Sequence, residues 1–259
     1  MPKQHASYNI VGVRVDDVTR DDILREIEAF MQEPGLHHIV TPNIDHILHA
    51  QKDHEFRDLV NVSALSVPDG KWLVRGSRLA GVHFREGVAG RLLVEPMCEL
   101  AARRGWSIYI LASVNDVAKV AGDKLQARYP GLKVAGTRSP SMQFGKDEAE
   151  TEAILRELDT LKPDILFLGV GAPKSEKWIF KYKDRLPARV AIGVGYAFDV
   201  IAGRVRECPL WMTRTGMEWA YRLLVEPKRL WKRYLVRDPQ FFGLILRQRF
   251  SSRSNQWSA

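Results

Sequence analysis

Short β-branched runs alternate with amphipathic helical stretches along most of this chain, and this alternation constrains the fold more than any other feature. In the second half, the strand-like runs cover residues 107–113, 132–138, 164–171 and 189–195. Stretches with apolar residues at helical spacing separate them, at residues 115–129, 147–161 and 175–186. Such alternation is typical of a mostly parallel sheet with helices on both faces. We therefore predict an α/β chain with a Rossmann-like sheet.

The first half of the chain follows the same pattern with shorter elements. Strands are expected at residues 8–15, 37–40 and 64–70, the last being a short buried run closed by a Pro-Asp-Gly turn. Helices are expected at residues 19–32, 45–60, 71–80 and 89–105. Thr19 and Asp22 have the spacing of a capping box at the start of the first helix. Pro96 could kink the last one.

The net charge of +8 is confined to one end of the chain. Residues 203–259 contain 12 Lys and Arg against 4 Asp and Glu, whereas residues 1–202 contain 27 of each. Four of the seven tryptophans lie in the same basic segment. Strand signals are replaced there by short helical stretches between prolines, at residues 212–225, 228–236 and 241–250. We therefore predict a core over residues 1–202 and a short helical C-terminal appendage over residues 203–259.

The basic, aromatic appendage has two interpretations. It could be a solvated tail that its charge keeps soluble. It could instead be a surface for lipid headgroups or phosphates, which its many aromatic residues favour. No run of about 18 apolar residues and no signal-peptide pattern occurs, so membrane contact is expected only at the surface. Cys98 and Cys208 show neither metal-type spacing nor a disulfide framework, which suits the cytoplasm.

The expected ligand site lies beyond the C-terminal ends of the parallel strands, where loops and helix N-termini meet. Polar or glycine-rich segments occupy such ends at residues 41–43, 67–70, 169–173 and 193–195. Their backbone N–H groups could hold a diphosphate, although each glycine could also be an ordinary turn residue. Neither G-x-G-x-x-G nor the P-loop pattern is present, so a nicotinamide-dependent enzyme lacks its fingerprint here.

Two acidic residues are candidates for chemistry. Asp69 follows a buried strand, so its carboxylate either faces a pocket or bonds its own backbone in the turn. Asp199 lies in an apolar setting where an unpaired carboxylate is costly, so it either caps a helix or binds a ligand hydroxyl. His46 and His49 have no obvious third ligand, so no metal site is expected.

Positive charge for a diphosphate is available in the appendage. The sequence has no Asp-x-Asp pair of the kind that holds a divalent ion in many sugar-nucleotide enzymes, so protein groups would have to neutralise the phosphates. If residues 228–236 are helical, Arg229 and Arg233 share one face, and Arg222 lies near the end of the preceding helix. A solvated helix face is the alternative, which the interleaved aromatic residues disfavour.

Four segments resemble, in order, the WecG/TagA/CpsF glycosyltransferases (glycosyltransferase family 26). They are TPNIDHILHAQKD with the following VPDG, FLGVGAPKSEKWI, GVGYAFDVIAG and GMEWAYRLLVEPKRLWKRYL. The resemblance runs from about residue 8 to residue 236. It implies inverting transfer of a sugar from a UDP-sugar to a polyprenyl-diphosphate-linked saccharide, without metal or cofactor, in the synthesis of bacterial cell-surface polymers.

The resemblance also implies roles for individual residues. Thr41 matches a conserved threonine of the family and Asp69 its proposed catalytic base. Asn43 and Asp199 match positions near the nucleotide. The appendage arginines named above match a segment thought to close over the active site and to touch the membrane. Other expected substrate-binding positions are Arg85, Gly171, Ser175, Glu176 and Gly195.

The implied partners are a nucleotide-sugar donor, a polyprenyl-diphosphate-linked acceptor and the inner face of the bacterial membrane. Self-association occurs in the family, and nucleic acid is not expected.

The chain departs from the family pattern in three places. Ser175 stands where the family usually has Gln, Glu207 where it has Arg, and Ala89 at about the place of an Asp. The changes at Ser175 and Ala89 fall where the sugar or nucleotide should lie. Either the donor differs from N-acetylmannosamine types, or activity is weakened. The second hypothesis is therefore a catalytically impaired relative that binds membranes or nucleic acid through its basic appendage.

Overall fold

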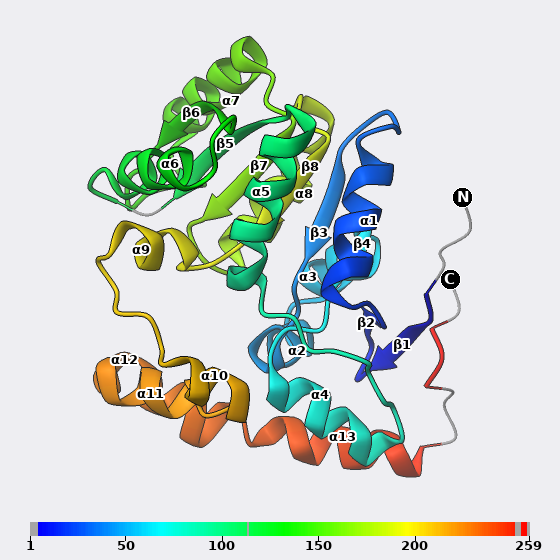
Figure 1. Ribbon diagram of the computed structural model, residues 1–259. Helices are drawn as coiled ribbons and strands as arrows, with labels where there is room; N and C mark the ends of the chain where they lie inside the picture. The colour runs from blue at the N-terminus through cyan, green and yellow to red at the C-terminus, as the bar shows by residue number, and fades with distance from the viewer. Residues whose placement is uncertain (1–4, 113, 252–254, 258–259) are drawn as a thin grey trace.

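The computed structural model describes residues 5–112, 114–251 and 255–257. Within them, six strands form the main sheet in the order β4-β3-β8-β7-β5-β6 (Figure 1). These strands are β3 (His37–Val40), β4 (Leu65–Ser66), β5 (Ser107–Ala112), β6 (Lys133–Arg138), β7 (Ile165–Gly169) and β8 (Val190–Gly193). Every neighbouring pair is parallel. The predicted α/β fold with a mostly parallel sheet is confirmed.

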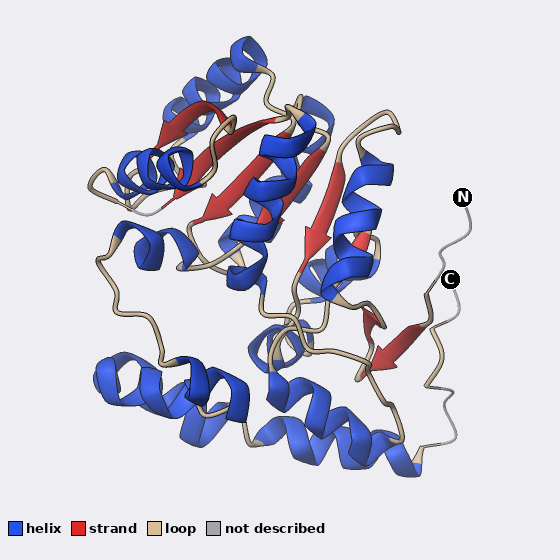
Figure 2. Cartoon of the chain, viewed as in Figure 1, coloured by secondary structure: helices blue, strands red, loops and turns tan. Residues whose placement is uncertain are grey.

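Helices cover both faces of this sheet (Figure 2). One face packs against α1 (Arg20–Phe30), α5 (Val94–Arg104) and α6 (Val117–Arg128). The other packs against α7 (Glu148–Leu161) and α8 (Lys174–Tyr182). Strand β5 supplies both layers because successive side chains of a strand point to opposite faces. Ile108 and Ile110 are buried in the first layer, and Tyr109 and Leu111 in the second.

The N-terminal segment differs from the single strand expected at residues 8–15. It forms an antiparallel hairpin of β1 (Ser7–Ile10) and β2 (Val13–Asp16), outside the main sheet. Val11 and Gly12 between them have φ angles of 51° and 82°. Two consecutive residues in this left-handed region make a tight hairpin turn, so the strand cannot continue through them.

Helix boundaries in the first half follow local capping. The capping box of Thr19 and Asp22 at the start of α1 is confirmed. The single helix expected at residues 45–60 is wrong: the structure has α2 (Ile44–Ala50) and α3 (His54–Asn61). The side chain of Asp53 accepts a hydrogen bond from the Phe56 N–H and starts the second helix. Pro96 lies in the first turn of α5, where proline removes no intrahelical hydrogen bond, so it gives no cause for a kink.

The next connection follows β4 and leads into α5. It is formed by α4 (Lys71–Ser77), then η1 (Arg78–Ala80) and η2 (Gly90–Leu93).

The C-terminal segment is helical, as predicted, and lies below the C-terminal ends of the strands in Figure 1. After α9 (Ala197–Ala202) come α10 (Leu210–Thr215), α11 (Glu218–Val225), α12 (Pro227–Trp231), the π-helical η4 (Lys232–Arg237) and α13 (Gln240–Phe250). Gly216, with a φ angle of 82°, ends α10 and divides the helix expected at residues 212–225.

The last helix, α13, packs against α2, α4 and η1. Its Phe241 and Ile245 are fully buried in a hydrophobic cluster with residues of the N-terminal hairpin, α2, α3 and α4. Part of the basic segment thus contributes to the hydrophobic interior of the protein. The division of the chain at residue 203 stays a prediction.

Candidate active site

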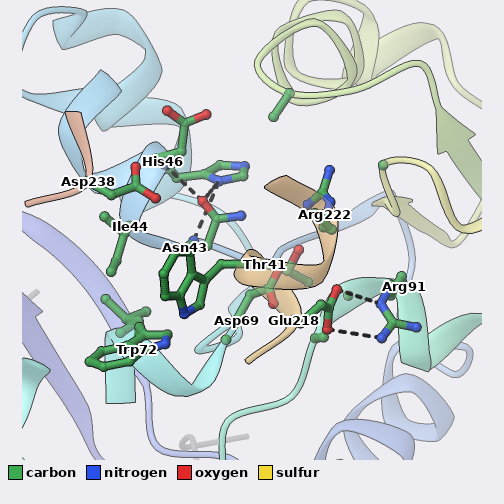
Figure 3. Close-up of a pocket in the computed structure, with 18 of the residues that line it drawn as sticks. Thr41, Asn43, Ile44, His46, Asp69, Trp72, Arg91, Glu218, Arg222 and Asp238 are labelled. Carbon is green, nitrogen blue, oxygen red and sulfur yellow. Dashed lines mark hydrogen bonds and ion pairs between the residues drawn. The ribbon is translucent and has the colours of Figure 1, made fainter. Parts of the chain in front are cut away.

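A cavity of about 640 Å³ lies where the C-terminal ends of β3, β4, β7 and β8 meet the C-terminal helices (Figure 3). All four strand ends expected to form a site contribute to its lining. The sequence-predicted residues that line it are Thr41, Asn43, Asp69, Gly171, Glu176, Gly195, Arg222, Arg229 and Arg233. These residues come from the whole length of the chain, and the parallel topology brings them to one edge of the sheet.

Asp69 projects into this cavity from the loop after β4. Its backbone N–H donates to the carbonyl of Pro42 at 2.9 Å, which ties the loop to the end of β3. Part of its surface is open to the cavity, and protein surrounds the rest. This removal from water raises the pKa of Asp69 to about 6. Electrostatic interaction with His46 lowers the pKa of Asp69, and so do hydrogen bonds with Asn43 and the Gly90 backbone. The nearby Glu218 raises this pKa further.

Such a carboxyl changes protonation state close to neutral pH. A group of this kind can accept a proton from a substrate hydroxyl.

Thr41 and Gly90 pack closely against each other beside Asp69. Thr41 is buried at the end of β3. A Cβ atom placed on Gly90 would lie 2.6 Å from Thr41 Oγ1, so no larger residue fits without moving the threonine. The glycine therefore lets the backbone of η2 approach both Thr41 and Asp69.

Asn43 connects the start of α2 with Asp69. Its Oδ1 accepts hydrogen bonds from the backbone N–H of His46, at 3.2 Å, and from His46 Nδ1, at 2.9 Å. This orientation turns the amide NH₂ away from the helix, and the side chain forms a hydrogen bond with Asp69. Asn43 is thus both a helix cap and a donor to the candidate base.

A partly buried ion pair holds α11 against the cavity. Arg91 of η2 donates to Glu218 of α11 from Nε at 3.1 Å and from Nη2 at 3.0 Å. The hydroxyl of Tyr196, after β8, donates to the same carboxylate at 3.0 Å. The guanidinium of Arg222, one turn along α11, lies over the Tyr196 ring at 4.3 Å from its centroid. These contacts fix an arginine of the C-terminal segment beside the strand ends.

The other two predicted arginines differ in their surroundings. Arg229 is exposed and pairs with Glu226 through its Nε at 3.0 Å. Arg233 is less exposed and its Nη1 lies 3.7 Å from Asp45 Oδ2. Both line the cavity, and their partners Glu226 and Asp45 are partly exposed to solvent, where an ion pair contributes little. An anionic ligand could therefore replace these contacts.

Three predicted residues do not line the cavity. Arg85 lies on the surface, where it pairs with Asp17 and Asp22, and its role in substrate binding stays a prediction. Ser175 is buried in the first turn of α8, and its hydroxyl donates to the carbonyl of Gly171 at 3.4 Å. Asp199 lies in the first turn of α9, and its carbonyl accepts hydrogen bonds from the residues that end that helix.

The part of the chain that the structure describes holds no group of three or more His, Cys, Asp or Glu that could bind a metal ion. Its helices include none that is long and apolar enough to cross a membrane.

Comparison with known proteins identifies the chain. The WecG/TagA/CpsF glycosyltransferase family matches residues 8–255. The chain belongs to this family. It is 32% identical over 210 residues to the N-acetylglucosaminyldiphosphoundecaprenol N-acetyl-beta-D-mannosaminyltransferase of Bacillus subtilis, with 81% of this chain and 79% of the relative covered. A Staphylococcus aureus protein of the same name is 27% identical over 227 residues, or 87% of each chain. The chain is therefore a glycosyltransferase.

The departures from the family pattern lie in or beside the cavity. Ala89 lines the cavity, next to Gly90. Ser175 lies behind its wall, as described above. The carboxylate of Glu207 lies 3.8 Å from Arg91 Nη1 and is more exposed than that of Glu218. The arginine that the family usually has at this position would instead bring a second positive charge towards Arg91.

Several lining residues could not be predicted from sequence. Those with polar or aromatic side chains include His46, Trp72, Arg91, Tyr196, Glu218, Trp219, Tyr234 and Asp238. Glu218 lies within the EW-x-YRL pattern that carried the family resemblance, which was a usable signal. Arg91 had no comparable signal, because nothing near it in the sequence distinguishes it from a surface arginine.

Proposed function

We propose that this glycosyltransferase moves a sugar, with inversion and without a metal, from a UDP-sugar to a polyprenyl-diphosphate-linked saccharide. The observation that carries the proposal is Asp69, a carboxyl with a pKa of about 6, in a cavity also lined by Arg222, Arg229 and Arg233. One base and several cations at one site are what a displacement of a nucleotide requires.

In the proposed reaction, the acceptor hydroxyl attacks the anomeric carbon of the donor sugar while Asp69 takes the hydroxyl proton. The new C–O bond forms as the bond between the anomeric carbon and the diphosphate oxygen breaks, and its electron pair leaves with UDP. A single displacement inverts the anomeric configuration. Arg222 and Arg229 stabilise the charge that develops on the leaving diphosphate, and the Thr41 hydroxyl donates to it.

The names of the relatives support an N-acetylhexosamine donor and an acceptor in which N-acetylglucosamine is carried on a polyprenyl diphosphate. Trp72 and Trp219 line the cavity and provide apolar faces on which a sugar ring or base could stack. The altered Ala89 and Ser175 are the positions at which we expect the donor preference to differ from that of the relatives.

Membrane contact through the C-terminal helices is the second part of the proposal. Leu224, Val225, Leu235 and Val236 have more than half of their surface exposed, and Lys228 and Lys232 lie between them in the sequence. Apolar side chains with cations beside them suit the interface of a membrane that contains anionic lipid. We place the enzyme on the cytoplasmic face, where such an acceptor and a nucleotide-sugar would meet.

The test is turnover of a panel of UDP-sugars with a short-chain polyprenyl-diphosphate N-acetylglucosamine acceptor. We expect one N-acetylhexosamine donor to react, and EDTA to leave the rate unchanged. The wild-type protein consuming no donor would contradict the proposal, and so would Asp69→Asn reacting as fast as the wild type. The alternative of an inactive nucleic-acid binder is not favoured by the comparisons, and it predicts no UDP-dependent rise in melting temperature.

A further inference from the structure

A line of polar side chains leads from Asp69 along the cavity wall to two buried residues, His46 and Glu176. Asn43 contacts Asp69 on one side and His46 on the other (Figure 3). The Nε2 atom of His46 lies 3.8 Å from Oε1 of Glu176. The line thus joins the loop after β4 to α2 and α8. Its outer member is the candidate base, and its inner members have no role in the reaction described above.

The hydrogen-bonding pattern fixes where the proton of His46 lies. An amide oxygen only accepts, so the 2.9 Å contact between Asn43 Oδ1 and His46 Nδ1 requires a proton on Nδ1. The 3.5 Å contact from the Asn43 backbone N–H to the same nitrogen is then not a hydrogen bond, because a protonated ring nitrogen cannot accept one. The remaining nitrogen, Nε2, faces a carboxylate. A second proton on Nε2 would give this ring a positive charge and pair it with Glu176.

Glu176 needs such a cation. Its side chain is about 4% exposed, and one of its oxygens has no hydrogen-bond partner among the described residues. Burial raises the pKa of Glu176, but its contacts with His46, a backbone hydrogen bond and His38 together hold that pKa below its ordinary value. His38, on β3, also acts on Glu176. Burial lowers the pKa of His38 to about 4, so His38 is neutral at pH 7 and cannot supply the balancing charge.

The same ring acts on the candidate base. The titratable groups that act on Asp69 are His46 from α2 and Glu218 from α11, and Asn43 and the Gly90 backbone bond to it. Glu218 disfavours the ionised form of Asp69, and His46 favours it. His46 itself faces Glu176 from α8, and the ring of Phe56 from α3 packs beside it.

We propose that His46 is a positioning residue for Asp69: paired with Glu176, its ring orients Asn43 towards Asp69 and favours the ionised form of the base. This inference rests on the proposed role of Asp69. Without the His46 ring, a larger fraction of Asp69 would be protonated near neutral pH, and Asn43 would lose the contact that holds its amide group towards the base.

The test is the pH dependence of kcat/KM for His46→Gln and Glu176→Gln. Glutamine at residue 46 can still donate to Asn43 but carries no charge. We expect the acidic limb of the profile to move up by about one pH unit in each variant, which is the effect of removing one nearby charge. At pH 6 the rate should fall several-fold against wild type, and at pH 8.5 it should largely recover. Because the two residues act as one unit, the double variant should move the limb no further than either single one.

His49→Gln is the matched control. His49 lies on the same helix and pairs with Asp53 at 3.2 Å, but it does not line the cavity. Its substitution should leave the acidic limb in place. A purely structural role of His46 would instead lower kcat/KM equally at every pH, and that outcome would overturn the inference.

A second measurement does not depend on turnover. A ¹³C NMR titration of the Asp69 carboxyl, assigned by the signal missing in Asp69→Asn, should show it losing its proton at a higher pH in His46→Gln than in the wild type. The same titration midpoint in both proteins would refute the proposal. The failures are distinguishable: full activity of Asp69→Asn removes the proposed base itself, whereas an inactive Asp69→Asn with an unmoved limb in His46→Gln removes only the role of His46.

Discussion

Glu218 and Arg91 form a two-bond ion pair, at 3.0 and 3.1 Å, that fastens α11 to the connection before α5. The Arg91 side chain is only 8% exposed, and that of Glu218 is 24% exposed. Burial alone would raise the pKa of Glu218, but pairing with Arg91 lowers it below its ordinary value. The pair is therefore charged, and either partner left alone would be a poorly hydrated charge at the cavity wall.

We predict that Arg91→Ala destabilises the protein and releases α11. The expected loss in the free energy of unfolding is roughly 3 kcal/mol, since the remaining carboxylate stays partly buried. Limited proteolysis should then cut between residues 203 and 217 faster than in the wild type. Arg85→Ala is the control, because Arg85 also contacts two carboxylates but is half exposed. It should cost less than about 1 kcal/mol. Equal effects of the two variants would contradict this prediction.

Asp69→Asn should lose turnover and gain stability above pH 6. The pKa of Asp69 is raised from 3.8 to about 6 in the folded protein, so the folded state binds this proton more tightly than the unfolded state does. The resulting stability is fully present below about pH 4 and is lost as pH rises through about 6.

Removing the titratable group should therefore leave the melting temperature unchanged at pH 4. At pH 8 it should raise the melting temperature, because the free energy of unfolding increases by roughly 1–3 kcal/mol. A variant that is less stable than the wild type at pH 8 would show that the ionised Asp69 carboxylate does not destabilise the folded protein.

Arg222→Lys should lose most of the activity, even though the charge is kept. The guanidinium lies over the Tyr196 ring, 4.3 Å from its centroid, and its planar fork could pair with a phosphate in a way that an ammonium cannot reproduce. We expect kcat to fall by about 10²–10³. Binding of UDP, measured by calorimetry, should weaken less than kcat falls. If Arg222→Lys keeps the wild-type kcat, the arginine serves as a general positive charge and not as a fork for the leaving group.

The sheet was predictable because its strands are short runs of β-branched residues, each bounded by a turn or a cap. The N-terminal hairpin was not, because the left-handed residue Val11 is itself β-branched and lies in an uninterrupted apolar run. Residues 45–60 form two helices because Asp53 caps the start of the second one. From the sequence, Asp53 could equally have been an exposed charge within a single helix.

The position of the cavity was predictable because it follows from where the parallel strands end. The ends of β3, β4, β7 and β8 were expected at one edge, and Asp69, Thr41 and Asn43 lie there. The partners of these residues were not predictable, because they depend on contacts between distant segments. Arg91 and Glu218 are 127 residues apart in the chain, and no local pattern joins them. The same holds for His46 and Glu176, whose pairing depends on how α8 packs on α3, β8 and β3.

Leu224→Glu should weaken membrane binding without slowing the reaction in water. Leu224 is 79% exposed on α11 and does not line the cavity. We expect binding to vesicles that contain phosphatidylglycerol to weaken about tenfold or more, because an apolar contact is replaced by a negative charge. Met142→Glu, at a position 77% exposed in the loop before α7, should leave it nearly unchanged. Equal losses in co-sedimentation would mean that net charge alone governs binding.

Phe241→Ala should destabilise the whole protein, since this residue of the basic segment is completely buried. Its ring fills the space above Gly76 of α4 so closely that a Cβ on that glycine would lie 2.5 Å away. The expected loss is roughly 3–5 kcal/mol in the free energy of unfolding, measured by urea denaturation. Phe250→Ala, at the exposed end of the same helix, should cost less than about 0.5 kcal/mol.

The same packing affects how the C-terminal helices should be tested. Deleting residues 203–259 would remove Phe241 and Ile245 from the cluster that holds α2, so loss of turnover in that variant would report unfolding as well as a missing site. Point variants at Arg222 and Leu224 avoid this, because neither residue is buried in the cluster. If Phe241→Ala unfolds at the same urea concentration as the wild type, the cluster is not what anchors α13, and the deletion becomes a valid test of function.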